Sequence, residues 1–132
     1  MERNEVPEAM ARAAAHWWAE RADGTARHRT GENSGAAALA GLLADSLNTP
    51  PAAGSLERFE KILAEKIMTS PRHEWMTIWV DYAPGGILWD AAKEAGINPA
   101  NFPWKTGMHI HPEEGTIYVR LSLGKWEKIY PE

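Results

Sequence analysis

The spacing of hydrophobic residues changes partway along the chain, from a helical period to the alternation typical of strands. Over 7–22, 34–47 and 55–69, hydrophobic residues recur every three or four positions, which predicts three amphipathic helices. Ser34 and Ser55 are suited to cap the second and third of these helices. The hydrophobic stripes consist of Met10, Ala14 and Trp17; of Leu39, Leu42, Leu43 and Leu47; and of Leu56, Phe59, Ile62, Leu63 and Ile67.

The second half of the chain carries strand patterns. Residues 74–82 are rich in β-branched and aromatic side chains and predict a strand, and 105–111 and 116–123 predict two more. A short helix is expected over 87–95, after the first strand, and the Pro-Glu-Glu-Gly sequence at 112–115 predicts a four-residue hairpin loop. The expected fold class is therefore α+β: three N-terminal helices followed by β-α-β-β, with a small antiparallel sheet.

The chain length fits a single domain. Its 132 residues suffice for one hydrophobic core. We expect one domain over 1–132, with a helical part at about 7–69 and a sheet-containing part at about 74–130. The tail from 125 is expected to pack back on the body of the protein.

Side chains alternate between the two faces of a strand, so each predicted strand can be sorted by face. One face is aliphatic and must meet the helices, because burial of each large aliphatic side chain contributes roughly 1.5–3 kcal/mol. The four-residue loop sets the hairpin register, in which the opposite pairs are His111 with Thr116, His109 with Tyr118, and Gly107 with Arg120. If the first strand joins this sheet, the second face displays Trp75, Trp79, His109, His111, Tyr118 and Arg120.

Two interpretations of these rings remain open. Flat rings interleaved with cationic and hydrogen-bonding groups suit a nucleotide base or a flat protein epitope. Alternatively, helices cover both faces and the tryptophans belong to the core. The same choice applies to Trp104, which follows a proline: it is either a plug at the edge of the core or a rigid aromatic rim beside an open face.

The pair of histidines in the second strand raises the possibility of a metal site. His109 and His111 project from the same side of the strand, a spacing that zinc and iron sites use, and Glu113 would be a third ligand. The alternative is two half-exposed strand histidines beside a hairpin loop. We favour this alternative and expect neither a metal nor another cofactor.

A phosphate-binding loop is a further alternative. Arg27 and Arg29 precede a glycine-bearing loop and Ser34, which begins a helix, and free amide groups at a helix N-terminus together with arginines can hold a phosphate. There is no Walker pattern, so an ordinary polar loop explains the same residues. No serine lies in a nucleophile elbow, and no triad is indicated. We therefore expect a protein without enzymatic activity.

Composition narrows the function classes further. The chain has no cysteine, which excludes disulfides and thiolate zinc sites and fits a reducing cytoplasm. A net charge of −4 disfavours a broad nucleic-acid-binding surface, and no segment is apolar enough to span a membrane. Seven tryptophans are many for a chain of this length.

Several stretches of the sequence resemble a group of small proteins encoded by phages and prophages. These are Trp17-Trp18, ERFEKIL at 57–63, VDYAPGGIL at 80–88, AAKEAGI at 91–97, NFPWKT at 101–106 and WEKIY at 126–130. The resemblance implies an anti-defence protein acting in the host cytoplasm.

Three functions follow as hypotheses. The leading one is a non-enzymatic inhibitor, similar to anti-CRISPR proteins, that binds a bacterial immune complex by protein–protein contact. The second is a sponge that sequesters immune signalling nucleotides, and the third a metal-dependent hydrolase that uses His109 and His111. The sequence leaves the oligomeric state open, including a homodimer.

Overall fold

The structure, a computed structural model, describes residues 6–23, 50–69, 76–81 and 83–131. The described part has an α+β fold with three α-helices and one four-stranded antiparallel sheet, which confirms the predicted class. In chain order the elements are α1 (Glu8–Glu20), α3 (Ser55–Thr69), β1 (Met76–Val80), α4 (Gly86–Ala95), the 3-10 turn η1 (Pro99–Asn101), β2 (Thr106–His111), β3 (Thr116–Arg120) and β4 (Trp126–Tyr130). The predicted helix at 34–47 lies outside the described residues.

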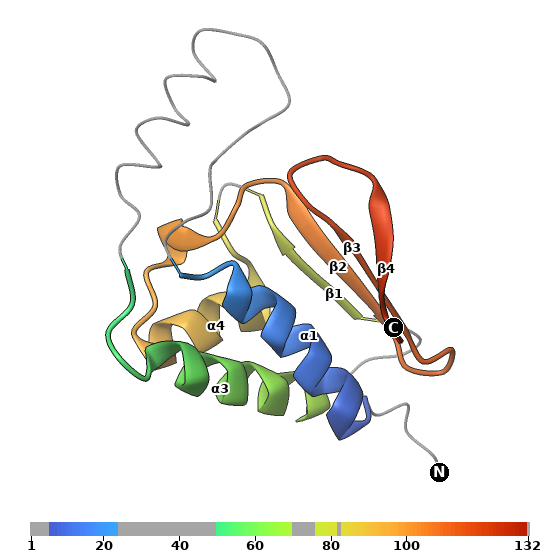
Figure 1. Ribbon diagram of the computed structural model, residues 1–132, viewed down its shortest axis with the longest axis horizontal. Coiled ribbons are helices and arrows are strands. Elements are labelled where there is room, and N and C mark those ends of the chain that lie inside the picture. Colours follow the sequence, from blue (N-terminus) through green and yellow to red (C-terminus); the bar gives the residue numbers. More distant parts are fainter. Residues whose placement is uncertain (1–5, 24–49, 70–75, 82, 132) are drawn as a thin grey trace, which may run out of the picture.

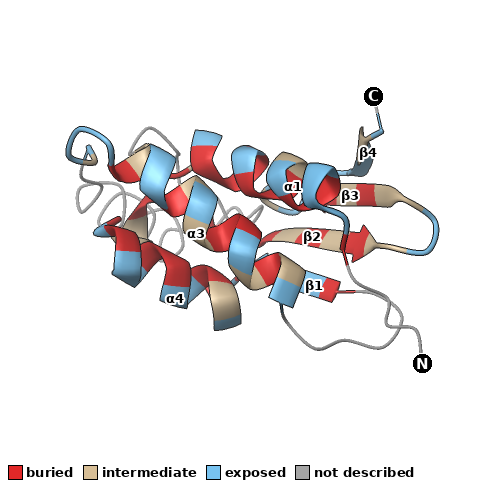
Figure 2. Ribbon diagram, turned by 90° about the horizontal axis from the view of Figure 1, so that it is seen from below, coloured by how far each residue is buried: buried red, intermediate tan, exposed pale blue. Residues whose placement is uncertain are grey.

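The three helices form one layer against one face of the sheet, with α3 between α1 and α4 (Figures 1 and 2). The 3.6-residue period of α3 explains its position, since Phe59, Leu63 and Ile67 fall on one stripe and are fully buried. None of the helices in the described part of the chain is long and apolar enough to cross a membrane.

The core lies between this helical layer and the aliphatic face of the sheet. That face consists of Met76, Ile78, Val80, Met108, Ile110, Ile117 and Val119, all at most 8% exposed. Trp18, fully buried in α1, meets the edge of Phe102 at a ring-centroid distance of 6.1 Å, and Phe102 lies 5.7 Å from Phe59 of α3. These three rings join both helices to the segment that leads into β2, so the sheet is held firmly against the helices.

The sheet contains one strand more than predicted. Its order is β1-β2-β3-β4, and each strand is antiparallel to its neighbour in sequence. The tail does pack back on the body, but as β4 at the sheet edge, which corrects the β-α-β-β layout to β-α-β-β-β. The hairpin register of β2 and β3 is as predicted, with His111 opposite Thr116 and Gly107 opposite Arg120.

The third strand ends earlier than its sequence pattern predicts. We expected it to run to Leu123 on the aliphatic face, but β3 stops at Arg120. Ser122 and Leu123 have positive φ angles of 49° and 67°, which no strand can accommodate, and they turn the chain toward β4. Leu121 and Leu123 are consequently 46% and 42% exposed instead of buried.

The connection between α4 and β2 is fixed by buried polar contacts. The side chain of Asn101 is fully buried and donates a hydrogen bond to the backbone oxygen of Ala22, at 3.0 Å. This bond ties η1 to the end of α1 and leads the chain into the core before β2 begins. Trp104 follows on this path and is only 8% exposed. The structure therefore supports the interpretation of Trp104 as a plug at the edge of the core. The alternative, an exposed aromatic rim beside the open sheet face, is wrong.

Candidate functional site

The face of the sheet opposite the helices carries five of the six side chains expected there from the sequence, and the sixth, Trp75, lies outside the described residues. We call this face the open face. Because strand side chains alternate, it is made of Thr77 and Trp79 of β1; Gly107, His109 and His111 of β2; Thr116, Tyr118 and Arg120 of β3; and Trp126 and Lys128 of β4. All helices of the described part pack on the other side (Figure 2).

Strand pairing arranges these residues in rows that cross the sheet. One row runs Trp79, Gly107, Arg120 and Trp126, and the next runs Thr77, His109, Tyr118 and Lys128. Trp79 and Trp126 stand at the two edges of the first row and are 49% and 43% exposed. The histidines, the tyrosine and the arginine between them are half-buried. The open face is thus accessible and lined by aromatic groups.

The most ordered feature of the open face is a stack of Trp126 on His109. Their ring centroids lie 4.4 Å apart with the planes inclined by 31°. The indole reaches from β4 across β3 to β2, where a Cβ added to Gly107 would lie 3.5 Å from its Cζ/Cη edge. Gly107 therefore provides the bare backbone on which the ring lies. Arg120 lies between Gly107 and Trp126 in the same row. Its Nε donates a hydrogen bond to the backbone oxygen of Gly124 at 3.0 Å.

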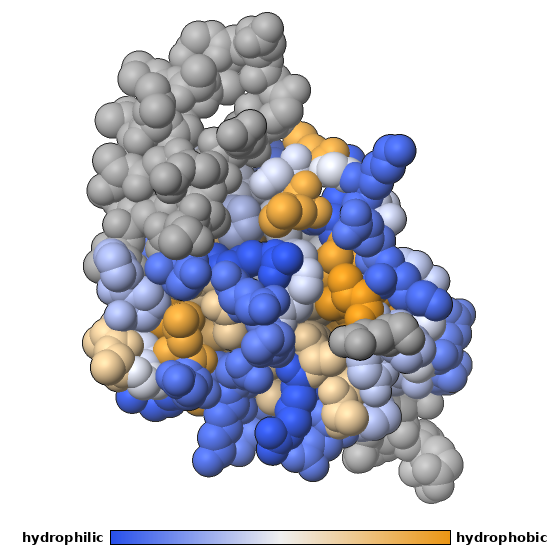
Figure 3. All heavy atoms as spheres, viewed as in Figure 1, coloured by the Kyte–Doolittle hydropathy of each residue, from blue (hydrophilic) through white to orange (hydrophobic). Residues whose placement is uncertain are grey.

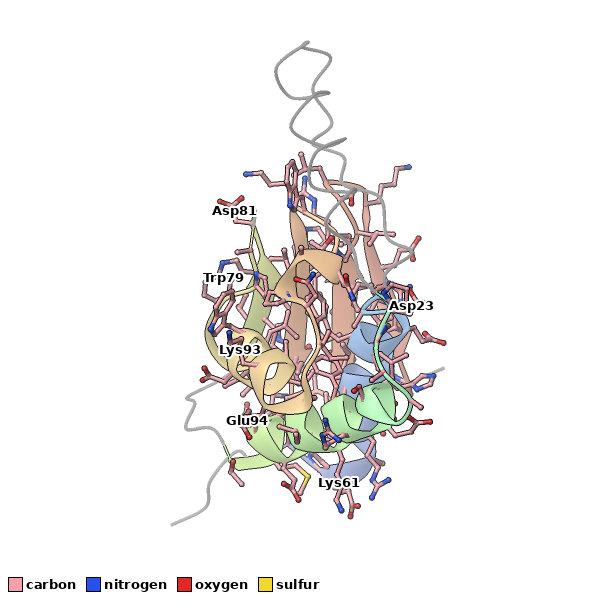
Figure 4. All side chains as sticks on the ribbon, turned by 90° about the vertical axis from the view of Figure 1, so that its left-hand side faces the viewer. Asp23, Lys61, Trp79, Asp81, Lys93 and Glu94 are labelled. Carbon is pink, nitrogen blue, oxygen red and sulfur yellow. The ribbon has the colours of Figure 1, made fainter. Side chains whose placement is uncertain are left out.

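Trp79 closes the open face at the opposite edge. Its ring lies against Gly85, where an added Cβ would come within 3.2 Å of the indole. This distance is tighter than an ordinary contact, so a side chain at 85 would require the ring to shift by a small amount. Figure 4 shows Trp79 at the outer edge of the sheet, near Lys93 of α4 and below Asp81. Asp81 in turn forms an ion pair with Lys105, which joins the end of β1 to the start of β2.

The two histidines have different surroundings. Burial beneath the indole and the neighbouring charge of His111 lower the pKa of His109 below its usual 6.5. His109 is consequently neutral at physiological pH, with hydrogen-bonding capacity and no charge. The His111 ring meets the edge of Tyr118 at a centroid distance of 6.0 Å. The open face thus combines the imidazole of His109 with aromatic rings.

Charge is divided unevenly between the two sides of the molecule. The open face carries Arg120 and Lys128, and none of its residues named above is acidic. Within the described residues neither cation takes part in an ion pair, while the helices display charges of both signs, with glutamates such as Glu57 and Glu65 beside Arg58 and Lys61. Figure 3 shows mostly hydrophilic side chains over α1 and α3, interrupted by small apolar patches. The net charge of −4 is therefore not the charge of the open face.

A metal centre at the histidine pair finds no support in the described part of the chain. The rings of His109 and His111 lie 6.2 Å apart, but no group of three or more histidine, aspartate or glutamate side chains is placed to hold a metal ion there. Glu113 therefore does not complete the set proposed from the sequence. Two ligands alone do not make a closed or a catalytic zinc site.

Several predicted residues fall outside the described residues. These are Trp75 of the predicted face and Arg27, Arg29 and Ser34 of the predicted phosphate loop. Conversely, the sequence analysis missed Trp126 and Lys128 as members of the open face. The signal that could have found them is Gly124 followed by WEKIY, a turn residue before a run rich in aromatic and β-branched side chains.

Comparison of the chain with models of protein families, with characterised proteins and with solved structures gives no match. The function must therefore be inferred from the open face itself.

Proposed function

We propose that this protein is a non-enzymatic binding protein that inhibits a bacterial immune complex by attaching to it through the open face. One observation supports this most strongly: two half-exposed tryptophans frame a continuous surface of rings, hydrogen-bonding groups and two cations. Tryptophan, tyrosine and arginine are the residues that dominate binding energy at interfaces. The resemblance to phage-encoded proteins supplies the proposed target, a CRISPR-like complex in the cytoplasm of the host.

The rigidity of the open face favours binding. Trp126 is already fixed on His109, and Trp79 is fixed against Gly85, so neither ring has to be ordered when a partner arrives. Each immobilised, flexible side chain would otherwise cost about 0.5–1.5 kcal/mol. The face is thus organised before binding, whereas the exposed helical surfaces carry long, flexible glutamate and lysine side chains.

The test measures association with purified immune complexes and their nuclease activity. The wild-type protein should co-elute with a target complex and inhibit it, and Trp126→Ala should weaken binding at least about tenfold because it removes one of the two exposed aromatic anchors. Trp89→Ala is the matched control, since Trp89 is 40% exposed but lies on α4. Immune complexes that remain fully active with the protein in excess would overturn the proposal.

A nucleotide sponge is a second candidate, favoured by one specific feature. The exposed side of the Trp126 ring offers a stacking surface for a base, with Arg120 and Lys128 available for phosphate. A panel of cyclic and ADP-ribose-type nucleotides in a thermal-shift assay tests it, because a ligand at 100 times its Kd adds about 2.7 kcal/mol of stability. No shift with any of them would exclude this function.

A further inference from the structure

We propose that the open face binds single-stranded nucleic acid, so that the part of the immune complex it contacts is an unpaired strand. This inference rests on the proposed function, because it names the component recognised by the same surface. It begins from the charge of the open face. Cations favour a partner of negative potential, and the paired strand positions of the open face offer two cations and no carboxylate, while Asp81 beyond the end of β1 is held in an ion pair with Lys105. A phosphate backbone is a partner of one sign only.

The rings of the open face supply the second requirement. Bases of single strands stack on aromatic side chains, and four-stranded sheets with exposed rings hold two or three bases in this way. Here Trp79, Tyr118 and Trp126 lie in two adjacent rows of such a sheet. Strands about 4.8 Å apart place β1 and β4 about 14 Å from each other, which is room for about two or three nucleotides.

The hydrogen-bonding groups complete the site. His109 and His111 lie between the rings, so polar nitrogen atoms form part of the same surface. Lys128 lies beside Tyr118 in the same row, and Arg120 lies beside Trp126, so each of these rings has a cation next to it that can reach a phosphate. Two aromatic rings of the open face, Tyr118 and Trp126, thus each have a cation beside them.

A duplex does not suit the same surface. Duplexes bury their bases in the stack and offer mainly phosphates, which require a broad basic surface. The described helices carry charges of both signs and the net charge of the chain is −4, so neither provides such a surface. The expected preference is therefore for single strands over duplexes, with an affinity that depends more on stacking than on charge.

The experiment uses the full chain and fluorescein-labelled 12-mers of U and of dT, with the corresponding duplexes and mononucleotides as separate arms. Binding is followed by anisotropy and by quenching of tryptophan fluorescence. Both single strands should bind, and the two arms distinguish an RNA from a DNA preference. Since two cations contact phosphate, log Kd should change with log salt concentration by a slope of about 1.4 in magnitude.

Substitutions locate the site. Trp126→Ala should weaken binding roughly 5- to 150-fold, the range that corresponds to one lost stacking contact. Lys128→Ala should lower the salt slope by about 0.7. Trp89→Ala and Lys61→Ala, on α4 and α3, are the matched controls and should leave both values unchanged. Circular dichroism of each variant checks that the fold is intact, and Trp79→Ala offers a second ring should Trp126→Ala not fold.

Three results would overturn the inference. The first is an absence of binding to either 12-mer while the protein still associates with an immune complex, which would assign the open face to a protein epitope and leave the proposed function standing. The second is binding that neither ring substitution nor Lys128→Ala changes. The third is equal affinity for a mononucleotide and a 12-mer, which would identify a nucleotide sponge instead. Strand binding without any association with immune complexes would refute the proposed function alone.

Discussion

At the scale of single residues, the aromatic stack of the open face lies over a glycine. Gly107 is in β2, inside a four-stranded sheet, where a glycine is usually unfavourable. The indole of Trp126 reaches over it from two strands away, at van der Waals distance from where a Cβ would be, and covers His109. Trp126 thus helps to bury His109, although it lies 17 positions further along the chain. The register of β2, β3 and β4 brings the two rings together.

Replacement of Trp126 by alanine should raise the pKa of His109 toward 6.5. Burial is the main reason that this pKa is low, and removal of the indole lets water reach the imidazolium form. A titration of the histidine ring protons by NMR measures the change. Trp89→Ala should leave the pKa of His109 where it is, because Trp89 lies on α4. An unchanged pKa in Trp126→Ala would mean that the stack does not bury the ring.

At the scale of elements, the helices α1 and α3 are joined at the surface by a histidine bridge. His16 of α1 lies 3.2 Å from Glu60 of α3 through Nδ1 and 3.3 Å from Glu20 through Nε2. The hydrogen bond to Glu60 is the main cause that raises the pKa of His16 above 6.5, and the charges of both glutamates add to it. Protonation of one residue therefore strengthens the contact between two helices.

The stability that His16 contributes should depend on pH. Its pKa is higher in the folded than in the unfolded chain, so the contribution is full below pH 6.5 and is lost as pH rises through the folded-state value. Because the side chains are largely exposed, we expect less than about 1 kcal/mol. Urea unfolding of the wild type and of His16→Ala between about pH 5.5 and about pH 9 measures this difference. A difference that stays constant over this range would contradict the bridge.

The elements also show how far the sequence could predict this fold. The β2–β3 register was predictable, since the loop length and the alternation of Met108 and Ile110 with the histidines fix it. The end of β3 was not, because alternation continues through Leu121 and Leu123 while the backbone has already turned. Strand β4 was missed since its side chains lie at an edge and are mostly exposed, which removes the regular burial pattern.

The candidate site was predictable only in part, because some of its residues lie on β4, the strand that the sequence pattern did not indicate. The residues of β1, β2 and β3 were assigned to one face from alternation alone, and the structure places Trp79, His109, His111, Tyr118 and Arg120 there. The stack of Trp126 on His109 depends on pairing between β3 and β4 and on the space above Gly107. Such long-range geometry has no counterpart in the local pattern of a sequence.

At the scale of the whole molecule, the six tryptophans in the described part of the chain fall into two groups. Trp17, Trp18 and Trp104 are at most 8% exposed, within the helical layer and the core. Trp79, Trp89 and Trp126 are at least 40% exposed, two of them on the open face. The molecule therefore contains rings that hold the fold together and rings that meet solvent.

This division predicts the accessibility of tryptophan fluorescence to acrylamide. Quenching of the folded protein should resolve a protected and an accessible population, and replacement of residues 79, 89 and 126 by phenylalanine should greatly reduce the accessible one. A 12-mer or a protein partner bound to the open face should shield Trp79 and Trp126, while Trp89 remains accessible. A single, uniformly protected population in the free protein would contradict the arrangement described above.

Pairing of each strand with its neighbour in sequence has an evolutionary consequence. The residues of the open face occupy alternate positions in strands β1 to β4. The intervening positions of β1, β2 and β3 face the core. Mutations can accumulate at one set of positions while the other continues to dictate folding. The residues of the open face can therefore be substituted one at a time while the core positions preserve the fold.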